Sequence, residues 1–431
     1  MQENLPEISE NMEDDADEDY EASEVSVSID EILATDNIAS ILSKNKLVSI
    51  GSDCKRGLEI DMESRSEWLK LNAEAMDLAL QVSNPKNTPW PKAANMVYPI
   101  ITVAAIQFAA RAYPAVVPGK EIVKGTVYGY DGGVPVLASD GNPAVNPQTG
   151  ETLWKVKPGE KAAQADRISR HMSWQLLEQD EDWESDTDAM LHYLPIAGVA
   201  FRKRYVDQET STMLSKWLPA TELVVNNSAP SLDKAPRISE MVNLYPSEIR
   251  KRMNTGVWID YDIDVLRNND IDDAQEESSA GDPEPDDDDA LIPFVEQHCL
   301  IDIDDDGYPE PYIVTFSRAG GHVVSIVRAF DVDDVHSDDD DAVLYIDRQI
   351  SYIKYDFIPH PKGEFYSLGF GWLLGNLNRG INTTINQMLD SGALANRPMG
   401  WIAKGLRMRG GTRDFKPGEF KMVDAPGRTL A

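Results

Sequence analysis

The feature that most limits the fold of this sequence is a long proline-free stretch from Phe370 to Asn396. Its apolar residues recur at three- and four-residue steps and form one narrow stripe, made of Leu374, Leu377, Ile381, Ile385 and Met388. That spacing is typical of an amphipathic α-helix. At 1.5 Å per residue the helix would be about 40 Å long. The stretch therefore predicts one long element that differs in character from the segments before it.

The rest of the chain predicts both helices and strands. Helical spacing occurs at Ile29–Val48, Asp53–Val82, Ile100–Tyr113 and Glu160–Met190, and a short helix should open at Tyr245–Glu248. Strand-like runs occur within Val116–Val156 and at Ala200–Val206, Trp217–Val225, Val295–Ile303, Tyr312–Ser317, Val323–Phe330, Val343–Asp347 and Tyr352–Ile358. We interpret the last five runs as an antiparallel meander. The pattern predicts an α+β fold.

The net charge of −34 is concentrated in three segments, Met1–Glu31, Asp260–Leu291 and Asp331–Asp341. They hold 34 acidic residues and one basic residue, Arg267, so the rest of the chain is close to neutral. Such runs are typical of solvated, disordered surface. Two further interpretations stay open: self-repulsion that keeps an assembly soluble, and a negative surface past which DNA slides. A protein that grips nucleic acid through a basic face is excluded, because that affinity depends on Lys and Arg contacts with phosphate.

The two cysteines, Cys54 and Cys299, are too few and too far apart for a disulfide framework, which favours reduced thiols. The apolar segment Met96–Val117 contains Gln107 and Arg111 and is interrupted by two prolines. A membrane-spanning helix needs about 20 mostly apolar residues. We therefore interpret this segment as a buried or interface helix and expect that the protein does not associate with a membrane.

Motifs for catalysis and cofactors are weak. The chain has no phosphate-binding loop of the G-x-x-x-x-G-K-[ST] type, and Gly369–Gly375 has the wrong spacing for a dinucleotide. The six histidines lack helical pairing and the cysteines form no C-x-x-C. We expect no cofactor and no catalytic residues.

Acidic residues offer two weaker metal hypotheses. Asp302, Asp304 and Asp306 match the first half of a calcium loop, but Ile313 stands where its bidentate glutamate should be, which favours a hairpin turn. The Asp260–Asp264 and Asp338–Asp341 clusters could hold two metals, as nucleases do. A metal-dependent nuclease or phosphoryl-transfer enzyme is therefore the main alternative function.

Three segments of this chain resemble portal proteins of short-tailed bacteriophages and their relatives. The first is WPKAANMVYPII at Trp90–Ile101, continued by QFAARAYP at Gln107–Pro114. The second is DIDDDGYPEPYIVT at Asp302–Thr315. The third is the long helix at Gly369–Asn396, followed by KPGEF at Lys416–Phe420. None is a strict motif, and the resemblance rests on their combination and order.

The resemblance implies a portal-like architecture. It comprises an acidic disordered tail (1–31), a wing of helices and antiparallel strands (32–365) with an acidic insert (260–291), a stem helix (366–396) and a clip (397–431). It also implies that stem residues pack between subunits, for which the candidates are Asn376, Asn378, Asn382, Asn386 and Gln387. The basic clip candidates, facing a partner or the channel, are Lys404, Arg407, Arg409, Arg413 and Lys416.

The function implied by the resemblance is structural, not enzymatic. Portal proteins form a dodecameric ring at the unique capsid vertex, through which double-stranded DNA is packaged and ejected without sequence specificity. The implied partners are further copies of the chain, the large terminase subunit, a head–tail adaptor, and the major capsid and scaffolding proteins. The implied location is the virion, after assembly in the host cytoplasm. Another capsid-associated structural protein is a further alternative.

One departure from the family pattern concerns the carboxyl end. Portal proteins of this type continue past the clip with a second stem helix, a tunnel loop and usually a crown, whereas this sequence ends at Ala431. We expect the carboxy-terminal part to be missing from this chain. We also expect that the chain alone does not form a stable ring.

Overall fold

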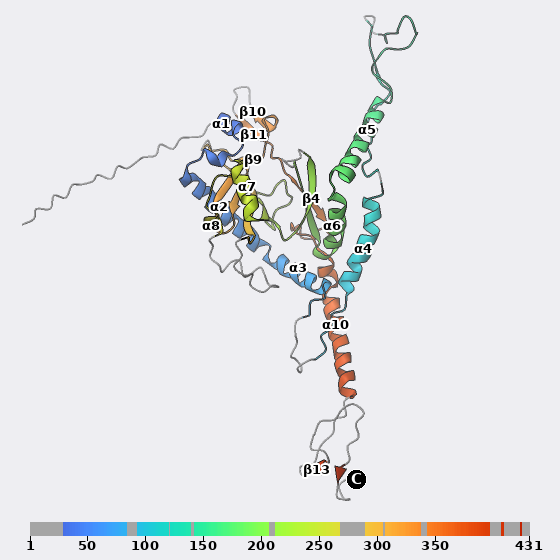
Figure 1. The fold of residues 1–431 in the computed structure, drawn as a ribbon. Coiled ribbons are helices and arrows are strands. Elements are labelled where there is room, and N and C mark those ends of the chain that lie inside the picture. The colour runs from blue at the N-terminus through green and yellow to red at the C-terminus, as the bar shows by residue number, and fades with distance from the viewer. Residues whose placement is uncertain are drawn as a thin grey trace, which may run out of the picture.

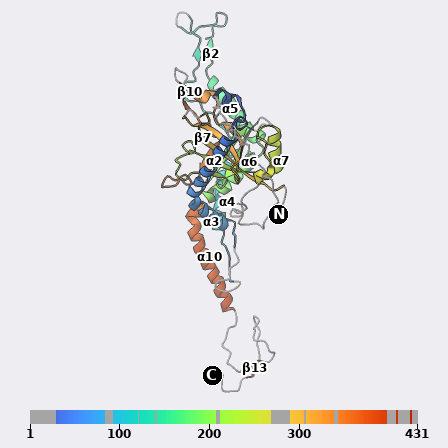
Figure 2. The same ribbon diagram turned by 90° about the vertical axis from the view of Figure 1, so that its left-hand side faces the viewer.

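The computed structural model describes residues 29–83, 93–119, 121–138, 142–206, 212–267, 289–304, 307–337 and 343–396, and the paired strands β13 (Arg407–Met408) and β14 (Val423–Asp424). Helices and antiparallel sheets form an α+β fold, as predicted. A body of two sheets and their covering helices lies at the centre (Figure 1). Helix α10 and an arm that contains α5 leave this body in opposite directions, as the second view also shows (Figure 2).

The larger sheet has five antiparallel strands in the order β5-β6-β7-β8-β9. Its strands are β5 (Leu223–Val225), β6 (Ile238–Leu244), β7 (Ile292–Ile301), β8 (Glu310–Ser317) and β9 (Val323–Arg328). The predicted succession of three strands from β7 to β9 is confirmed. The predicted strand over Trp217–Val225 is wrong in part, because the chain turns at Ala220 and places β4 and β5 in different sheets.

Helices α1 (Ile29–Ala34) and α2 (Lys44–Ser64), joined by the 3-10 turn η1 (Ile38–Ser40), pack on this sheet. The predicted helix over Ile29–Val48 is wrong, because Asn37 interrupts it. The Asn37 Oδ1 accepts hydrogen bonds from the backbone N–H groups of Ala39 and, on β9, Ile326. This side chain therefore caps η1 and also covers the outer edge of the sheet.

The core between α2 and the five-stranded sheet contains both cysteines. Cys54 on α2 and Cys299 on β7 are buried free thiols that interact with each other, and this contact together with burial raises the pKa of Cys299. Their separation in the sequence gave no sign of this contact.

The smaller sheet has the strand order β12-β3-β4, with β3 (Val199–Val206), β4 (Met213–Pro219) and β12 (Tyr352–Asp356). Helix α6 (Trp183–Ala197) packs against it. Two carboxylates cover the outer edge of β4: Asp180 accepts from Ser215 N at 2.9 Å and Asp186 from Trp217 N at 3.0 Å. An edge strand covered in this way cannot pair with another chain. Burial raises the pKa of Asp180.

Four helices meet where α10 leaves the body: α3 (Ser66–Ala79), α4 (Ile100–Val116), α6 and α10 (Phe370–Ala395). The predicted continuous helix over Asp53–Val82 is wrong, because the chain breaks at Arg65. The buried Arg65 guanidinium donates to the carbonyl oxygens of Ala220, Leu223 and Thr221 at 2.8, 3.0 and 2.9 Å. The break thus ties the helices to the turn between β4 and β5.

The arm consists of the extended chain after α4, the strands β1 (Val134–Pro135) and β2 (Trp154–Val156), and helix α5 (Glu160–Trp174). A π-helical turn, η2 (Gln175–Gln179), joins α5 to α6. The predicted single helix over Glu160–Met190 is wrong, because Asp180 leaves the helical conformation to bond the edge of β4.

Two of the acidic segments are partly folded, contrary to their interpretation as disordered surface. In Asp260–Leu291, residues Ile263–Arg267 form helix α8, whose Leu266 is buried. Helix α8 packs against α7 (Pro246–Asn254), which lies where the sequence predicts a short helix. In Asp331–Asp341, the chain forms η3 (Val332–Asp334) and β10 (Val335–Ser337), and β10 pairs with β11 (Val343–Ile346). The predicted five-strand meander is therefore wrong at its end, where β11 and β12 join other strands.

Candidate functional site

Helix α10 leaves the body through two close approaches that require glycine. A Cβ atom at Gly369 would lie 2.2 Å from the carbonyl oxygen of Ile196, at the end of α6. A Cβ atom at Gly371 would lie 2.2 Å from the Cβ of Ala75 on α3. Both distances are shorter than van der Waals contact, so glycine at these positions fixes how α10 packs on the body.

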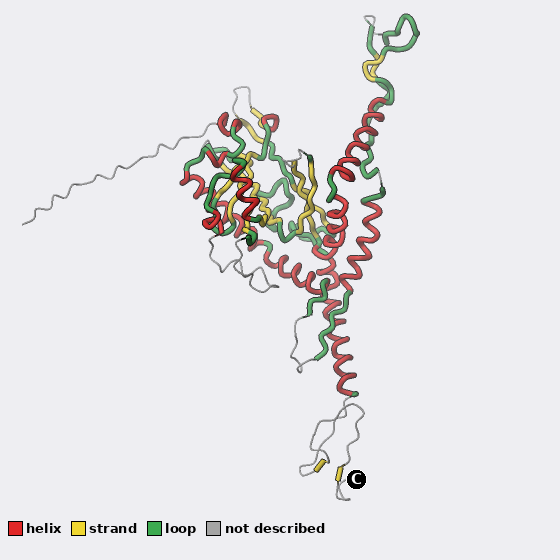
Figure 3. The backbone as a smooth tube through the Cα atoms, in the orientation of Figure 1, coloured by secondary structure: helices red, strands yellow, loops and turns green. Residues whose placement is uncertain are grey.

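Beyond the body, α10 is paired with the extended segment Ala94–Tyr98, which runs beside it (Figure 3). Three side chains spaced four residues apart accept hydrogen bonds from alternate backbone N–H groups of this segment. Asp390 accepts from Ala94 at 2.8 Å, Asn386 from Met96 at 2.7 Å, and Asn382 from Tyr98 at 2.8 Å.

The two repeats match in length. Two residues of an extended chain advance about 6.6 Å, and four residues of an α-helix rise about 6 Å. One side of α10 therefore presents acceptors to the extended segment much as a neighbouring strand would. We call this set of three bonds the side-chain ladder.

A second side of α10 is apolar and uncovered by the described residues. Leu373, Leu377 and Met388 are 44%, 57% and 68% exposed. Ile381 and Ile385, on the same side, are half-buried. A helix at the surface of a monomer normally turns such a stripe toward its core. Here the stripe continues past the body, so it forms a candidate contact surface.

The remaining predicted stem residues have different surroundings. Asn376 accepts from Arg379 Nη1 at 3.1 Å, and Arg379 also pairs with Glu74 on α3. Gln387 is exposed. Asn378 is fully buried, and neither polar atom of its side chain has a hydrogen-bond partner among the described residues. The structure uses Asn382 and Asn386 within the chain, while Asn376 and Gln387 remain predicted contacts between subunits.

A buried charged cluster joins the two sheets. Lys203 Nζ on β3 donates to Glu240 Oε2 on β6 at 2.7 Å and to Glu296 Oε1 on β7 at 2.8 Å. Tyr352 on β12 donates to Glu240 Oε2 at 2.7 Å, and His298 Nε2 lies 3.7 Å from Glu296 Oε1. We call these five residues the Lys203 cluster.

The environment of the Lys203 cluster shifts several pKa values. Burial disfavours the charge of Glu296, but the His298 side chain and the Lys203 ammonium outweigh it and hold the pKa of Glu296 at about 2. Burial lowers the pKa of His298. Burial also raises the pKa of Tyr352 well above its usual value. Because strands of both the smaller and the larger sheet contribute to it, the cluster links the two sheets through hydrogen bonds and ion pairs.

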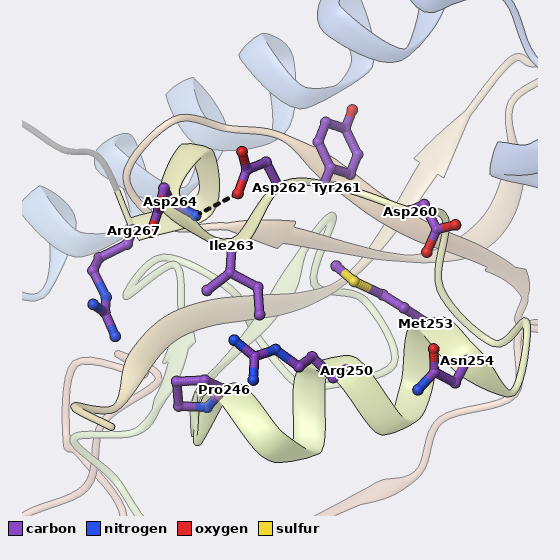
Figure 4. A pocket seen from close by; sticks show the side chains of 10 residues that line it. All are labelled: Pro246, Arg250, Met253, Asn254, Asp260, Tyr261, Asp262, Ile263, Asp264 and Arg267. Atoms are coloured by element: carbon purple, nitrogen blue, oxygen red, sulfur yellow. Dashed lines mark hydrogen bonds between the residues drawn. The ribbon is translucent and has the colours of Figure 1, made fainter. Parts of the chain in front are cut away.

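A cavity of about 570 Å³ lies between α7 and α8, and its lining residues do not include those of the Lys203 cluster. It includes the predicted metal cluster Asp260–Asp264. Figure 4 shows that these carboxylates do not converge: Asp262 accepts from Asp264 N at 3.1 Å at the start of α8, and Asp260 lies at the other side of the cavity. The geometry therefore does not support a two-metal site here.

The other predicted site residues are placed as follows. Asp302 accepts from Gly307 N at 2.9 Å in the turn between β7 and β8, and Gly307 has φ +92°. Asp306 lies outside the described residues, as do Asp338–Asp341 and the clip candidates Lys404, Arg409, Arg413 and Lys416. Arg407 lies on β13. Within the described ranges, no three potential ligands come together to hold a metal ion. In the same ranges, no helix has the length and apolar character needed to span a bilayer.

Comparison with known proteins adds no relative. No family model matches the chain, and no curated protein matches it either.

Sequence reasoning missed part of this site. Asp390 belongs to the side-chain ladder, and the four-residue spacing Asn382, Asn386, Asp390 is visible in the sequence. That spacing places the three side chains on one side of a helix. It does not reveal that their partner is a backbone segment almost 300 residues earlier.

Proposed function

We propose that this chain is a subunit of a bacteriophage portal, the ring at one capsid vertex through which DNA enters and leaves. The observation that carries the proposal is the uncovered apolar side of α10, on a 26-residue helix that projects from an α+β body. Exposed apolar surface of this kind marks an interaction site. In the proposed ring, copies of α10 surround a channel and pack against one another.

The proposal also covers the binding partners of the ring and its location. The ring would dock a terminase during packaging and a head–tail adaptor afterwards, and would sit in the virion. The proposed role is structural. Helix α10, held by the side-chain ladder, forms one rigid helix of the stem around the channel, and the body forms the outer wing. The order of sequence segments that resemble portal proteins supports the same function.

Self-association tests this proposal. Sedimentation velocity over a range of concentrations would compare the wild-type chain with Leu377→Glu, on the apolar side of α10, and Thr383→Glu, an exposed position on its polar side. A charge at Leu377 removes about 2 kcal/mol of favourable burial free energy, so association should weaken at least tenfold, whereas Thr383→Glu should associate as the wild type does. A wild-type chain that stays monomeric at every concentration, both alone and together with any polypeptide encoded directly downstream, would contradict the proposal.

A further inference from the structure

The arm exposes apolar side chains without having a core of its own. Among its described residues from 121 to 172, none is buried. Tyr128 and Tyr130 are 91% and 80% exposed, and Trp154 and Trp174 are 38% and 50% exposed. Further exposed apolar side chains on the arm are Val134, Val136, Leu137, Val145, Leu153, Ile168 and Met172.

The arm nevertheless has a defined backbone structure. Val136 N donates to Leu153 O at 2.8 Å, and Leu153 N donates to Ala144 O at 2.7 Å. At the base, Val123 N donates to Ser173 Oγ at 3.1 Å and holds the extended chain against α5. The arm thus presents its apolar side chains from a hydrogen-bonded framework.

The exposed area is large enough for a stable contact. An aromatic side chain offers 150–250 Å², so the exposed fractions of the four aromatic residues amount to about 500 Å². A stable interface buries about 800 Å² on each partner, which the aliphatic side chains of the arm bring within reach.

Charge indicates what covers the arm. Between Lys155 and Arg170 the arm has five basic and two acidic residues, of which Arg170 and Asp166 pair with each other at 2.7 Å on α5. Between Glu178 and Asp188 the chain has seven acidic residues and no basic one. Five of these acids are exposed: Glu178, Glu181, Asp182, Glu184 and Asp188. We call these five residues the acidic surface.

The acidic surface adjoins the end of α4. Tyr113 on α4 donates a hydrogen bond to Glu184, and that bond raises the pKa of Tyr113. Val116, at the end of the same helix, is 42% exposed. In both views the arm extends away from α6, which begins within the acidic surface (Figures 1 and 2). The far end of the arm, where Lys155 lies on β2, is therefore apart from the acidic surface of its own chain.

We infer that the arm of one copy docks on the acidic surface of a second copy. Two different surfaces that complement each other form a head-to-tail contact, which closes into a ring when the rotation between copies permits. The inference rests on the proposed function, because it adds to the ring a contact distant from α10. Basic residues of the arm would face the carboxylates, and its aromatic side chains would cover the end of α4.

Charge reversal tests this contact. One variant carries Lys157→Glu with Arg167→Glu, both exposed positions on the arm, and a second carries Glu181→Lys with Asp182→Lys on the acidic surface. Each variant alone places like charges against each other and should associate about tenfold more weakly than wild type at low salt. An equimolar mixture should recover association, because each reversed surface then meets its complement. Lys234→Glu, an exposed change elsewhere on the body, is the control and should behave as wild type does.

The outcomes separate this inference from the proposed function. Weak association of both variants with recovery in the mixture supports the arm contact. Variants that associate like wild type, or a mixture that does not recover, overturn the arm contact and leave the α10 contact standing if Leu377→Glu still weakens association. A wild-type chain that self-associates neither alone nor together with any polypeptide encoded directly downstream overturns both.

Discussion

The side-chain amide of Asn386 pairs with the backbone of Met96 in both directions. Its Oδ1 accepts from Met96 N at 2.7 Å, and its Nδ2 donates to Met96 O at 3.1 Å. An amide side chain has the same donor and acceptor groups as a peptide, so Asn386 replaces the residue that a neighbouring strand would supply. This pair is the centre of the side-chain ladder.

Replacing Asn386 with Ala should loosen the segment Ala94–Tyr98. The substitution removes both bonds, each of which contributes about 1 kcal/mol. We expect hydrogen exchange at the Met96 amide to accelerate about tenfold or more, with little change in the exchange of core strands such as β7. Gln387→Ala, the neighbouring exposed position, should leave this amide unchanged. Equal exchange rates in the two variants would show that the ladder does not hold the segment.

Gly371→Ala should destabilise the junction of α10 with α3. The added methyl group would lie 2.2 Å from the Cβ of Ala75, and overpacking of this kind costs about 1–3 kcal/mol. Gly380→Ala, on the same helix with no atom within 4 Å of the added Cβ, should stabilise the protein by about 0.5–1 kcal/mol. Denaturant unfolding measures both effects. A Gly371→Ala variant as stable as Gly380→Ala would contradict the close packing.

Glu296 should make stability depend on pH in the acid range. Its pKa is about 2 in the folded chain against an ordinary value of 4.5, so the folded state favours the charged form. Its contribution is fully present above pH 4.5 and is lost as the pH falls through 2. Glu296→Gln should therefore flatten the fall in the free energy of unfolding below pH 4.5. A variant with the wild-type slope would show that Glu296 does not carry this linkage.

His298 should make stability depend on pH over a higher pH range than Glu296 does. Burial lowers its pKa from the ordinary value of 6.5, so the unfolded chain binds a proton more readily than the folded one. Its contribution is present above pH 6.5 and is lost as the pH falls toward the folded pKa. His298→Phe keeps the aromatic contact with Tyr352 and should reduce the loss of stability as the pH falls below 6.5. The exposed His192→Gln is the control.

Local patterns in the sequence predicted several elements well. The helix over Phe370–Asn396 is present as α10, and α7 begins where Tyr245 N bonds to Glu248. The strands β7 to β9 were also found, because each is a run of apolar and β-branched residues bounded by turns. In these cases neighbours in the chain decide the structure.

The failures share a different cause, since distant contacts overrode the local pattern. Asn37 and Asp180 end helices because their side chains bond to sheet edges. Arg65 breaks a helix to reach the carbonyl oxygens of a turn more than 150 residues later. The Lys203 cluster likewise forms from four strands that only the fold brings together. Periodicity along the chain does not encode such partners.

The most direct test of the account is negative-stain electron microscopy of the chain, purified alone and co-expressed with any polypeptide encoded directly downstream. The account predicts rings with a central hole in at least one of the two samples. Monomers in both samples, accompanied by Mg²⁺-dependent cleavage of DNA, would contradict the portal account and favour an enzyme.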